Sequence, residues 1–206
     1  MSLNIAVLAV QGAFREHESM LRRLGCIPHE IRCHDDWFLR ERWDGLILPG
    51  GESTVQGKLL RVYDLLGPIH DAINDGLPVL ATCAGLILLA HHISNEDTTH
   101  IGTMPLTVRR NAYGRQVSSF QCISDLGTIS DFPMVFIRAP YIEKVENDIT
   151  SIARIDGHIV AARYHNQIGL AFHPELTDDT RIHESFLEIV RNHTKKSTHD
   201  GCSTIS

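Results

Sequence analysis

The segment 77–90 constrains the fold more than any other, because it joins two apolar runs through a short polar turn. The run 77–81 is typical of a short buried strand, and the run 86–90 is typical of a helix. Between them stand Thr82, Cys83, Ala84 and Gly85. A nucleophile in a sharp strand-to-helix turn is presented at the carboxyl edge of a sheet, in the arrangement called a nucleophile elbow. The start of the helix would also favour the thiolate form of Cys83.

A partner for such a cysteine stands far downstream, at His173 and Glu175, after the apolar run 167–172. An imidazole can take the thiol proton and return it, and a carboxylate can hold the imidazole in one tautomer. His173 and Glu175 are two residues apart, so in extended chain their side chains point to the same face. The alternatives are a solvated polar turn for this pair and an inert core thiol for Cys83, the usual place of an isolated cysteine. Taken together, the two motifs favour a Cys83–His173–Glu175 triad.

A glycine-rich loop provides a third element of an acyl-transfer site. The strand core 46–48 is followed by Pro49, Gly50, Gly51, Glu52, Ser53 and Thr54. Paired glycines let backbone N–H groups approach a ligand closely, and an oxyanion hole needs two such donors. We expect these donors from Gly51 and from Ala84, the residue after the nucleophile.

A phosphate-binding loop is the competing interpretation of the same segment. The spacing of that motif is not met here. Glu52 stands where the motif requires its first glycine, and Leu59 stands where it requires a metal-binding hydroxyl. A simple tight turn would explain the glycines but not the polar residues that follow them. We therefore retain the oxyanion-hole interpretation.

Much of the chain alternates between strand and helix patterns. Strands are expected over 3–10, 27–31, 46–48 and 77–81, and helices over 14–24, 55–66, 68–74 and 180–192. On the second of these helices the positions expected to share the buried face are Val55, Leu59, Tyr63 and Leu66. Such alternation predicts a three-layer α/β fold, in which a mostly parallel central sheet has helices on both faces.

The middle of the chain has a different pattern. The segments 106–108, 117–122, 134–137 and 159–164 resemble strands with few helices between them, so we expect an antiparallel extension of the same domain. The chain is long enough for one full core, and we expect a single domain over residues 1–193. The polar segment 194–206 has no apolar period and is expected to be a disordered tail.

Composition argues against several classes of protein. Acidic residues outnumber basic ones, 25 to 19, which argues against a nucleic-acid partner. Five scattered cysteines suit reduced thiols, and neither a membrane span nor a signal pattern is seen, so we expect a cytoplasmic protein without membrane contact. Thirteen histidines invite a metal site, but no zinc-type spacing occurs at 29–34 or 91–92. We expect no metal, and we expect most histidines to lie on the surface.

Longer sequence blocks make this chain resemble a known family. The blocks are AVQGAFREH (9–17), LPGGEST (48–54), TCAGL (82–86), RNAYGRQ (110–116), FIRAP (136–140) and HPELT (173–177). The cysteine and histidine blocks resemble the class I, triad-type glutamine amidotransferases, which have a flavodoxin-like sheet. The blocks at 9–17, 110–116 and 136–140 are similar to the glutaminase subunits of pyridoxal 5′-phosphate synthases. The resemblance extends to about residue 192, with one departure at Ala81, where these enzymes usually carry glycine and where we expect the methyl group to be tolerated.

The resemblance implies a reaction and a set of site residues. L-Glutamine would be hydrolysed to glutamate and ammonia without a cofactor, with Cys83 as nucleophile, His173 as general base and acid, and Glu175 as the orienting carboxylate. The implied glutamine contacts are Gly51, Glu52, Ser53, Arg110, Ile137 and Arg138. The two arginines suit the α-carboxylate of glutamine. The buried-looking strand next to Arg138 argues against a merely solvated charge there.

The resemblance also implies a partner, the synthase subunit of pyridoxal 5′-phosphate synthase, in a large hetero-oligomeric complex. This subunit would receive the ammonia and raise a low basal glutaminase activity. Gln11 and Gly12 follow the first strand at the same sheet edge as Cys83, so we expect their loop to respond to the partner.

Two alternatives remain. One is the glutaminase subunit of another amidotransferase, which the block at 110–116 argues against. The other is a cysteine hydrolase outside the amidotransferases on a similar fold, which would have no use for two arginines and the glycine-rich loop.

Overall fold

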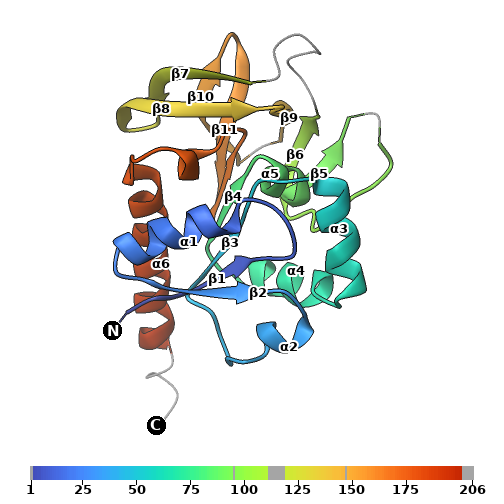
Figure 1. Cartoon of the computed structure of the whole chain (residues 1–206), viewed down its shortest axis with the longest axis vertical. Coiled ribbons are helices and arrows are strands. Elements are labelled where there is room, and N and C mark those ends of the chain that lie inside the picture. The colour runs from blue at the N-terminus through green and yellow to red at the C-terminus, as the bar shows by residue number, and fades with distance from the viewer. Residues whose placement is uncertain (1, 95, 111–118, 147, 201–206) are drawn as a thin grey trace.

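The fold centres on one large sheet with helices on both faces (Figure 1). The computed structural model describes residues 2–94, 96–110, 119–146 and 148–200. Within these residues the main sheet has ten strands, in the order β2-β1-β3-β4-β12-β11-β9-β6-β5, with β10 paired to β11, and β7 and β8 form a separate two-stranded sheet. The strands are β1 (Asn4–Leu8), β2 (Ile27–Ile31), β3 (Gly45–Leu48), β4 (Val79–Thr82), β5 (Ala90–Ile93), β6 (Met104–Arg109), β7 (Ser119–Leu126), β8 (Ile129–Ile137), β9 (Tyr141–Val145), β10 (Thr150–Ile155), β11 (His158–Tyr164) and β12 (Gln167–Leu170).

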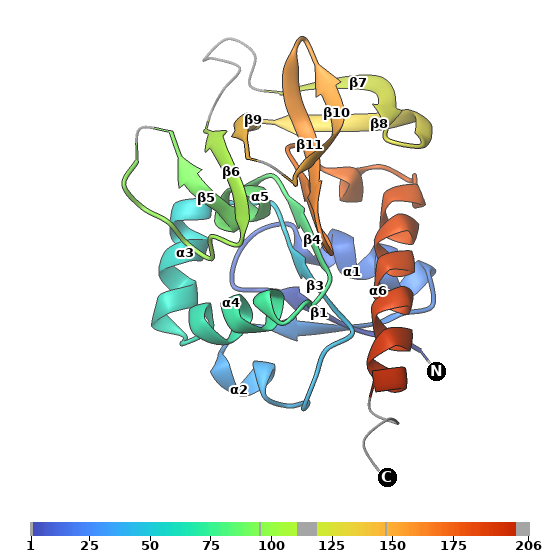
Figure 2. The same cartoon turned by 180° about the vertical axis from the view of Figure 1, so that it is seen from behind.

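The strands β2, β1, β3, β4 and β12 run parallel to one another. The helices are α1 (Phe14–Arg23), α2 (His34–Trp37), α3 (Ser53–Val62), α4 (Leu66–Asn74), α5 (Ala84–Leu89) and α6 (Arg181–Asp200), with the 3₁₀ turn η1 (Pro174–Leu176). The helices α1 and α6 cover one face of the sheet, whereas α3, α4 and α5 lie on the other (Figures 1 and 2). The expected three-layer α/β architecture is thereby confirmed. No described helix combines the length and the apolar character that a membrane span requires.

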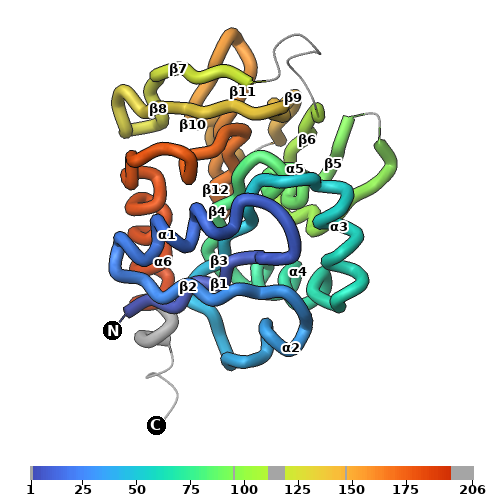
Figure 3. The backbone as a smooth tube through the Cα atoms, viewed as in Figure 1, coloured from blue at the N-terminus to red at the C-terminus, as the bar shows by residue number. Residues whose placement is uncertain are grey.

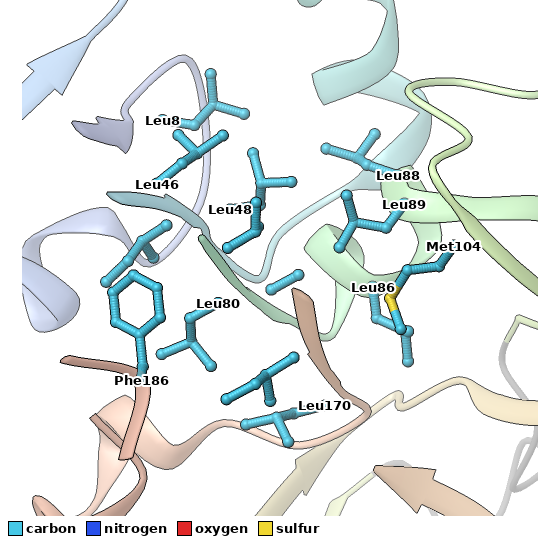
Figure 4. Close-up of a cluster of buried hydrophobic side chains, with 14 of the residues drawn as sticks. Leu8, Leu46, Leu48, Leu80, Leu86, Leu88, Leu89, Met104, Leu170 and Phe186 are labelled. Carbon is cyan, nitrogen blue, oxygen red and sulfur yellow. The ribbon is translucent and has the colours of Figure 1, made fainter. Parts of the chain in front are cut away.

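The core lies between the sheet and these helices (Figure 4). Leu48 and Leu80 are fully buried on β3 and β4, and α6 contributes Phe186. In the strand register, Leu80 lies beside Ile47 on one side and Ile168 on the other. Strands covered on both faces are apolar throughout, which is why β3 and β4 form continuous apolar runs in the sequence. Because β3 and β12 both pair parallel with β4, the carboxyl ends of these three strands lie at one edge of the sheet.

Beyond β12 the sheet becomes antiparallel, as expected for the middle of the chain. Strand β11 pairs antiparallel with β12, β9 and β10, and β9 pairs antiparallel with β6. Strand β5 differs, because it pairs parallel with β6. The sequence pattern missed β5, β9 and β10, in which partly and fully exposed positions interrupt the apolar residues. The strand predicted over 117–122 is described from Ser119 onward, and residues 111–118 lie outside the described part of the chain.

Helix α3 buries a different face from the one predicted. Val55 and Tyr63 are exposed, whereas Gln56 and Leu60 are fully buried. The Gln56 amide donates hydrogen bonds to backbone oxygens of the loops after β1 and β3, over 2.9 and 3.2 Å. These polar contacts, which apolar spacing cannot reveal, determine the orientation of the helix.

The last helix is longer than the sequence pattern suggested. Ile182 and Phe186 face the core as expected, but α6 ends at Asp200 rather than at Asn192. The segment 193–200 lacks apolar residues, yet it contains no glycine or proline that would break a helix. The tail expected to be disordered over 194–206 is therefore helical up to Asp200, and residues 201–206 lie outside the described chain.

Several loops meet at the carboxyl edge of the parallel strands, as the backbone path shows (Figure 3). Strand β1 leads to Gln11, β3 to Gly50, β4 to Cys83 and β12 to His173. The β7–β8 hairpin approaches the same edge, where the oxygen of Val135 accepts a hydrogen bond from the N–H of His173 over 2.8 Å. Segments far apart in sequence thus surround one site.

Candidate active site

The turn after β4 holds Cys83 in an unusual backbone conformation. Its φ and ψ angles are 47° and −100°. Residues with a Cβ seldom adopt such angles, and strain of this kind, on the order of 1–3 kcal/mol, is found mainly at functional sites. Gly85 makes the following helix fit, because a Cβ at this position would lie 2.1 Å from the carbonyl oxygen of Leu48. Cys83 therefore stands at a sharp turn between β4 and α5, as the sequence pattern predicted.

His173 and Glu175 form a buried hydrogen-bonded pair. His173 follows β12, and Glu175 lies within η1, whose first residue is Pro174. The Nδ1 atom of His173 is 2.7 Å from Oε1 of Glu175. An ionised carboxylate can only accept hydrogen bonds, so Nδ1 of His173 carries a proton and donates a hydrogen bond to Glu175. The Nε2 atom, on the other side of the ring, is then available toward the cavity. The expected orientation of an imidazole by a carboxylate is thus present in the geometry.

Gly50 lets His173 and Cys83 approach each other. A Cβ on Gly50 would lie 2.3 Å from Cε1 of His173 and 3.3 Å from Cβ of Cys83. Burial lowers the pKa of His173, but hydrogen bonds to Cys83 and Glu175 outweigh burial and raise this pKa to about 10. The raised pKa favours the imidazolium form of His173, which is the form that can protonate a leaving amide nitrogen.

The sulfur faces a cavity of about 180 Å³. Glu175 stands behind His173 and Ala84 is buried at the start of α5, so neither belongs to the cavity lining. All six residues expected to contact glutamine line this cavity. Together with Cys83 and His173, the lining residues are Gln11, Gly51, Glu52, Ser53, Ile87, Arg110, Ile137 and Arg138.

The two arginines differ in exposure. Arg110 is a quarter exposed, and its Nη1 donates to Oε1 of Glu96 over 2.7 Å and to Oγ1 of Thr54 over 3.1 Å. Arg138 is 68% exposed, and its Nη2 lies 3.5 Å from Oε1 of Glu52. Arg138 stands past the end of β8 and lines the cavity at its exposed rim, where it pairs with Glu52.

The loop after β1 is tied directly to the glycine-rich loop. Oε1 of Gln11 accepts a hydrogen bond from the N–H of Glu52 over 2.9 Å. The oxygen of Gly50 accepts a hydrogen bond from the N–H of Ala13 over 3.0 Å. Gly12 has a φ of +106°, and a Cβ there would lie 1.9 Å from the oxygen of Gly50. Two hydrogen bonds and close backbone packing therefore join the two loops.

Several polar residues around the site were not predicted from the sequence. Thr82 Oγ1 accepts a hydrogen bond from the N–H of Gly50 over 3.0 Å, and Nε2 of His17 lies 3.4 Å from Oε2 of Glu175. One signal was present, because His17 precedes Met20 and Leu21 by three and four residues, on the apolar face of its helix. The expectation that most histidines lie on the surface fails for this region, where His17, His173 and His183 are buried.

Comparison with known proteins gives consistent results. The family model for the SNO glutamine amidotransferase family matches residues 7–192. A relative from Desulfitobacterium hafniense (strain DSM 10664 / DCB-2), named pyridoxal 5′-phosphate synthase subunit PdxT, is 53% identical over 188 residues, covering 91% of this chain and 94% of the relative. A protein of the same name from Bifidobacterium longum (strain NCC 2705) is 50% identical over 189 residues, covering 89% of this chain and 98% of the relative.

Solved structures share the architecture. A crystal structure of a glutamine amidotransferase has a TM-score of 0.85 and 39% identity, covering 90% of this chain and 98% of that one. PurLQS from Thermotoga maritima has a TM-score of 0.67 at 16% identity, covering 91% of this chain and 99% of that one, a likeness of fold alone.

Proposed function

This chain belongs to the SNO glutamine amidotransferase family, and we propose that it hydrolyses L-glutamine to glutamate and ammonia with Cys83, His173 and Glu175 as its catalytic triad. The observation that carries the proposal is the approach of Cys83 and His173 around Gly50, beside a cavity lined by both. The buried Glu175 holds the far side of the imidazole over 2.7 Å.

In the first stage the Cys83 thiolate attacks the side-chain amide carbon of glutamine. A C–S bond forms, and the electron pair of the C=O double bond moves to the oxygen. We infer that the N–H groups of Gly51 and Ala84 hold this oxyanion. The His173 imidazolium gives its Nε2 proton to the amide nitrogen, the C–N bond breaks, and ammonia leaves a glutamyl thioester.

In the second stage a water molecule attacks the thioester carbon, and neutral His173 takes one of its protons. The new tetrahedral oxyanion collapses and the C–S bond breaks. Glutamate leaves, and Cys83 is again a thiolate beside the imidazolium. Glu175 keeps its charge throughout and stabilises the imidazolium that forms in each cycle.

Substrate binding follows from the charges on the cavity wall. Glutamine carries an α-carboxylate and an α-ammonium group. Arg110 and Arg138 supply guanidinium groups for the carboxylate, and the carboxylate of Glu52 suits the ammonium. Gly51, Ser53 and Ile137 complete the contacts around the substrate stem.

The relatives named PdxT are subunits of pyridoxal 5′-phosphate synthase, which suggests where the ammonia goes. We infer that this chain docks on a synthase subunit of that enzyme, in the cytoplasm and in a large hetero-oligomer, and delivers ammonia to it for pyridoxal 5′-phosphate formation. The link between the loops of Gln11 and Gly50 supports activation by the partner, because docking at one loop would shift the other.

The proposal is tested by glutamate release from glutamine, with and without an added synthase subunit. Cys83→Ala should abolish hydrolysis while leaving the far-UV circular dichroism spectrum and synthase binding unchanged. A glutamine-mimicking electrophile should label Cys83 in the unmodified chain. Labelling at Cys26, Cys33, Cys122 or Cys202 instead, or hydrolysis by Cys83→Ala, would overturn the assignment.

A further inference from the structure

A chain of buried polar side chains continues from Glu175 into the interior, away from the cavity. His17 on α1 and His183 on α6 are both fully buried. Nδ1 of His17 is 3.0 Å from Nε2 of His183. The other ring nitrogen of His17, Nε2, is 3.2 Å from Oγ1 of Thr82 and 3.4 Å from Oε2 of Glu175. One oxygen of Glu175 therefore faces His173 and the other faces His17.

The pKa values of both interior histidines are lowered, which favours their neutral forms. For His183, burial lowers the pKa and nearby His17 lowers it further. For His17, burial is the largest influence and lowers the pKa, and His173 adds to it, although Glu175 and Glu16 act in the opposite direction. Each ring therefore carries a single N–H, on either Nδ1 or Nε2.

The contacts decide which nitrogen carries that hydrogen. Nδ1 of His183 is buried without a hydrogen-bond partner among the described residues. A buried N–H without an acceptor is rarer than a buried acceptor without a donor, so the hydrogen of His183 belongs on Nε2. It is then donated to Nδ1 of His17, and the hydrogen of His17 must lie on Nε2. This N–H faces Thr82 and Glu175.

We propose that His17 is a positioning residue of the triad, whose Nε2–H steadies the outer oxygen of Glu175, and that His183 fixes the tautomer of His17 that this requires. The inference rests on the proposed function and extends it to two residues on α1 and α6. Oε2 of Glu175 has no hydrogen-bond partner within the described residues, so the N–H of His17, 3.4 Å away and shared with Thr82, compensates part of its charge. Without it, the carboxylate can rotate and weaken its 2.7 Å contact with His173.

Two replacements of His17 separate its two nitrogen positions. The amide of glutamine reaches the place of Nε2, whereas the shorter asparagine reaches only the place of Nδ1. His17→Asn should lower kcat on the order of 10-fold with little change in KM, as expected when a residue supporting a catalytic group is lost. His17→Gln should restore most of that loss. His29→Asn is the matched control, since His29 on β2 also has a pKa lowered by burial, but its Nε2 contacts Oδ1 of Asn4 over 3.0 Å and not the triad.

The pH profile distinguishes positioning from a general loss of structure. The groups facing His17 are Glu175 from η1, His173 before it, His183 from α6 and Thr82 from β4, and Glu16 lies beside it on α1. Losing the Nε2–H makes the Glu175 carboxylate easier to protonate, so the acid limb of the kcat profile should move to higher pH in His17→Asn and stay in place in His17→Gln. An equal loss at every pH in both variants would overturn the proposal.

A measurement on the unmodified chain does not depend on activity. Imidazole ¹⁵N chemical shifts at neutral pH should identify His17 and His183 as neutral Nε2–H tautomers. An Nδ1–H tautomer or an imidazolium at His17 would overturn the proposal, even if His17→Asn fails to fold. If the chain does not hydrolyse glutamine, the proposed function fails by itself. The rate of Cys83 alkylation by iodoacetamide, which depends on the same His173–Glu175 pair, then replaces kcat in the comparison, and equal rates in His17→Asn and His17→Gln refute the positioning role.

Discussion

Replacing Gly50 by alanine should separate Cys83 from His173 without altering either residue. The new Cβ would lie 2.3 Å from Cε1 and 2.9 Å from Nδ1 of His173, and 3.3 Å from Cβ of Cys83. Gly50 has no positive φ, so the backbone itself accepts alanine. The whole perturbation is therefore steric and acts on the imidazole first.

The size of the effect follows from these distances. Ordinary contacts of a Cβ begin at 3.4 Å. The imidazole must therefore retreat by about 1 Å, and a misplacement of that size typically costs ~10²-fold in rate. A loss of ~10²-fold corresponds to ~2.7 kcal/mol of transition-state stabilisation. Because Glu175 holds the ring from behind over 2.7 Å, the ring cannot retreat without weakening that contact as well.

Steady-state glutaminase kinetics test this prediction, with the synthase subunit present in excess. We expect kcat to fall while the far-UV circular dichroism spectrum stays unchanged, with a loss of stability of about 1–3 kcal/mol from overpacking. Gly67→Ala on α4 is the matched control, since nothing beyond the chain neighbours lies within 4 Å of a Cβ there, and it should leave kcat unchanged. Retention of kcat within a few-fold in Gly50→Ala would refute the proposed contact between Cys83 and His173.

Three further predictions concern the same site. His173→Ala should lower kcat roughly 10²-fold more than Glu175→Gln, because the carboxylate only orients the imidazole, and equal losses would give Glu175 another role. Gln11→Ala should reduce the activation by the synthase subunit more than it raises KM for glutamine, since it removes the acceptor of the Glu52 N–H, and unchanged activation would contradict a linked loop. The pKa of His173 is raised from 6.5 to about 10 in the folded chain, so its protonation stabilises the fold. This stabilisation is complete below pH 6.5, the pKa in the unfolded chain, and is lost progressively as the pH rises to 10. The melting-temperature advantage over His173→Gln should therefore shrink across this pH range, and a constant difference would contradict the raised pKa.

The sheet and the elbow could be predicted because local sequence determines them. Strands β3 and β4 are buried on both faces, so each forms a short, uninterrupted apolar run. Cys83 stands between such a run and a helix, which is the sequence pattern of the sharp strand-to-helix turn that presents a nucleophile. The antiparallel half was harder to predict, because β5, β9 and β10 mix exposed and buried positions without strict alternation.

The side chains around the site were predictable only where a strand end determines their place. Gly50, Cys83 and His173 all follow parallel strands, whose carboxyl ends share one edge. Glu96 pairs with Arg110 from outside these strands, and the buried orientation of Gln56 depends on loop oxygens from two other segments. Contacts of this kind arise from tertiary structure, and no spacing along the chain encodes them.

Ala81 shows how the register of the sheet accommodates a departure from the usual elbow. Its neighbours in the register are Leu48 on β3 and Gly169 on β12. Paired residues on adjacent strands present their side chains to the same face, so the methyl group of Ala81 lies beside a position that has no side chain. A Cβ on Gly169 would lie 2.7 Å from Cδ1 of Leu86. A side chain at Gly169 would therefore crowd the face under α5, whereas the small side chain of Ala81 is fully buried beside it. The methyl group of Ala81 thus has a glycine beside it on β12, which leaves room for it next to the turn at Cys83.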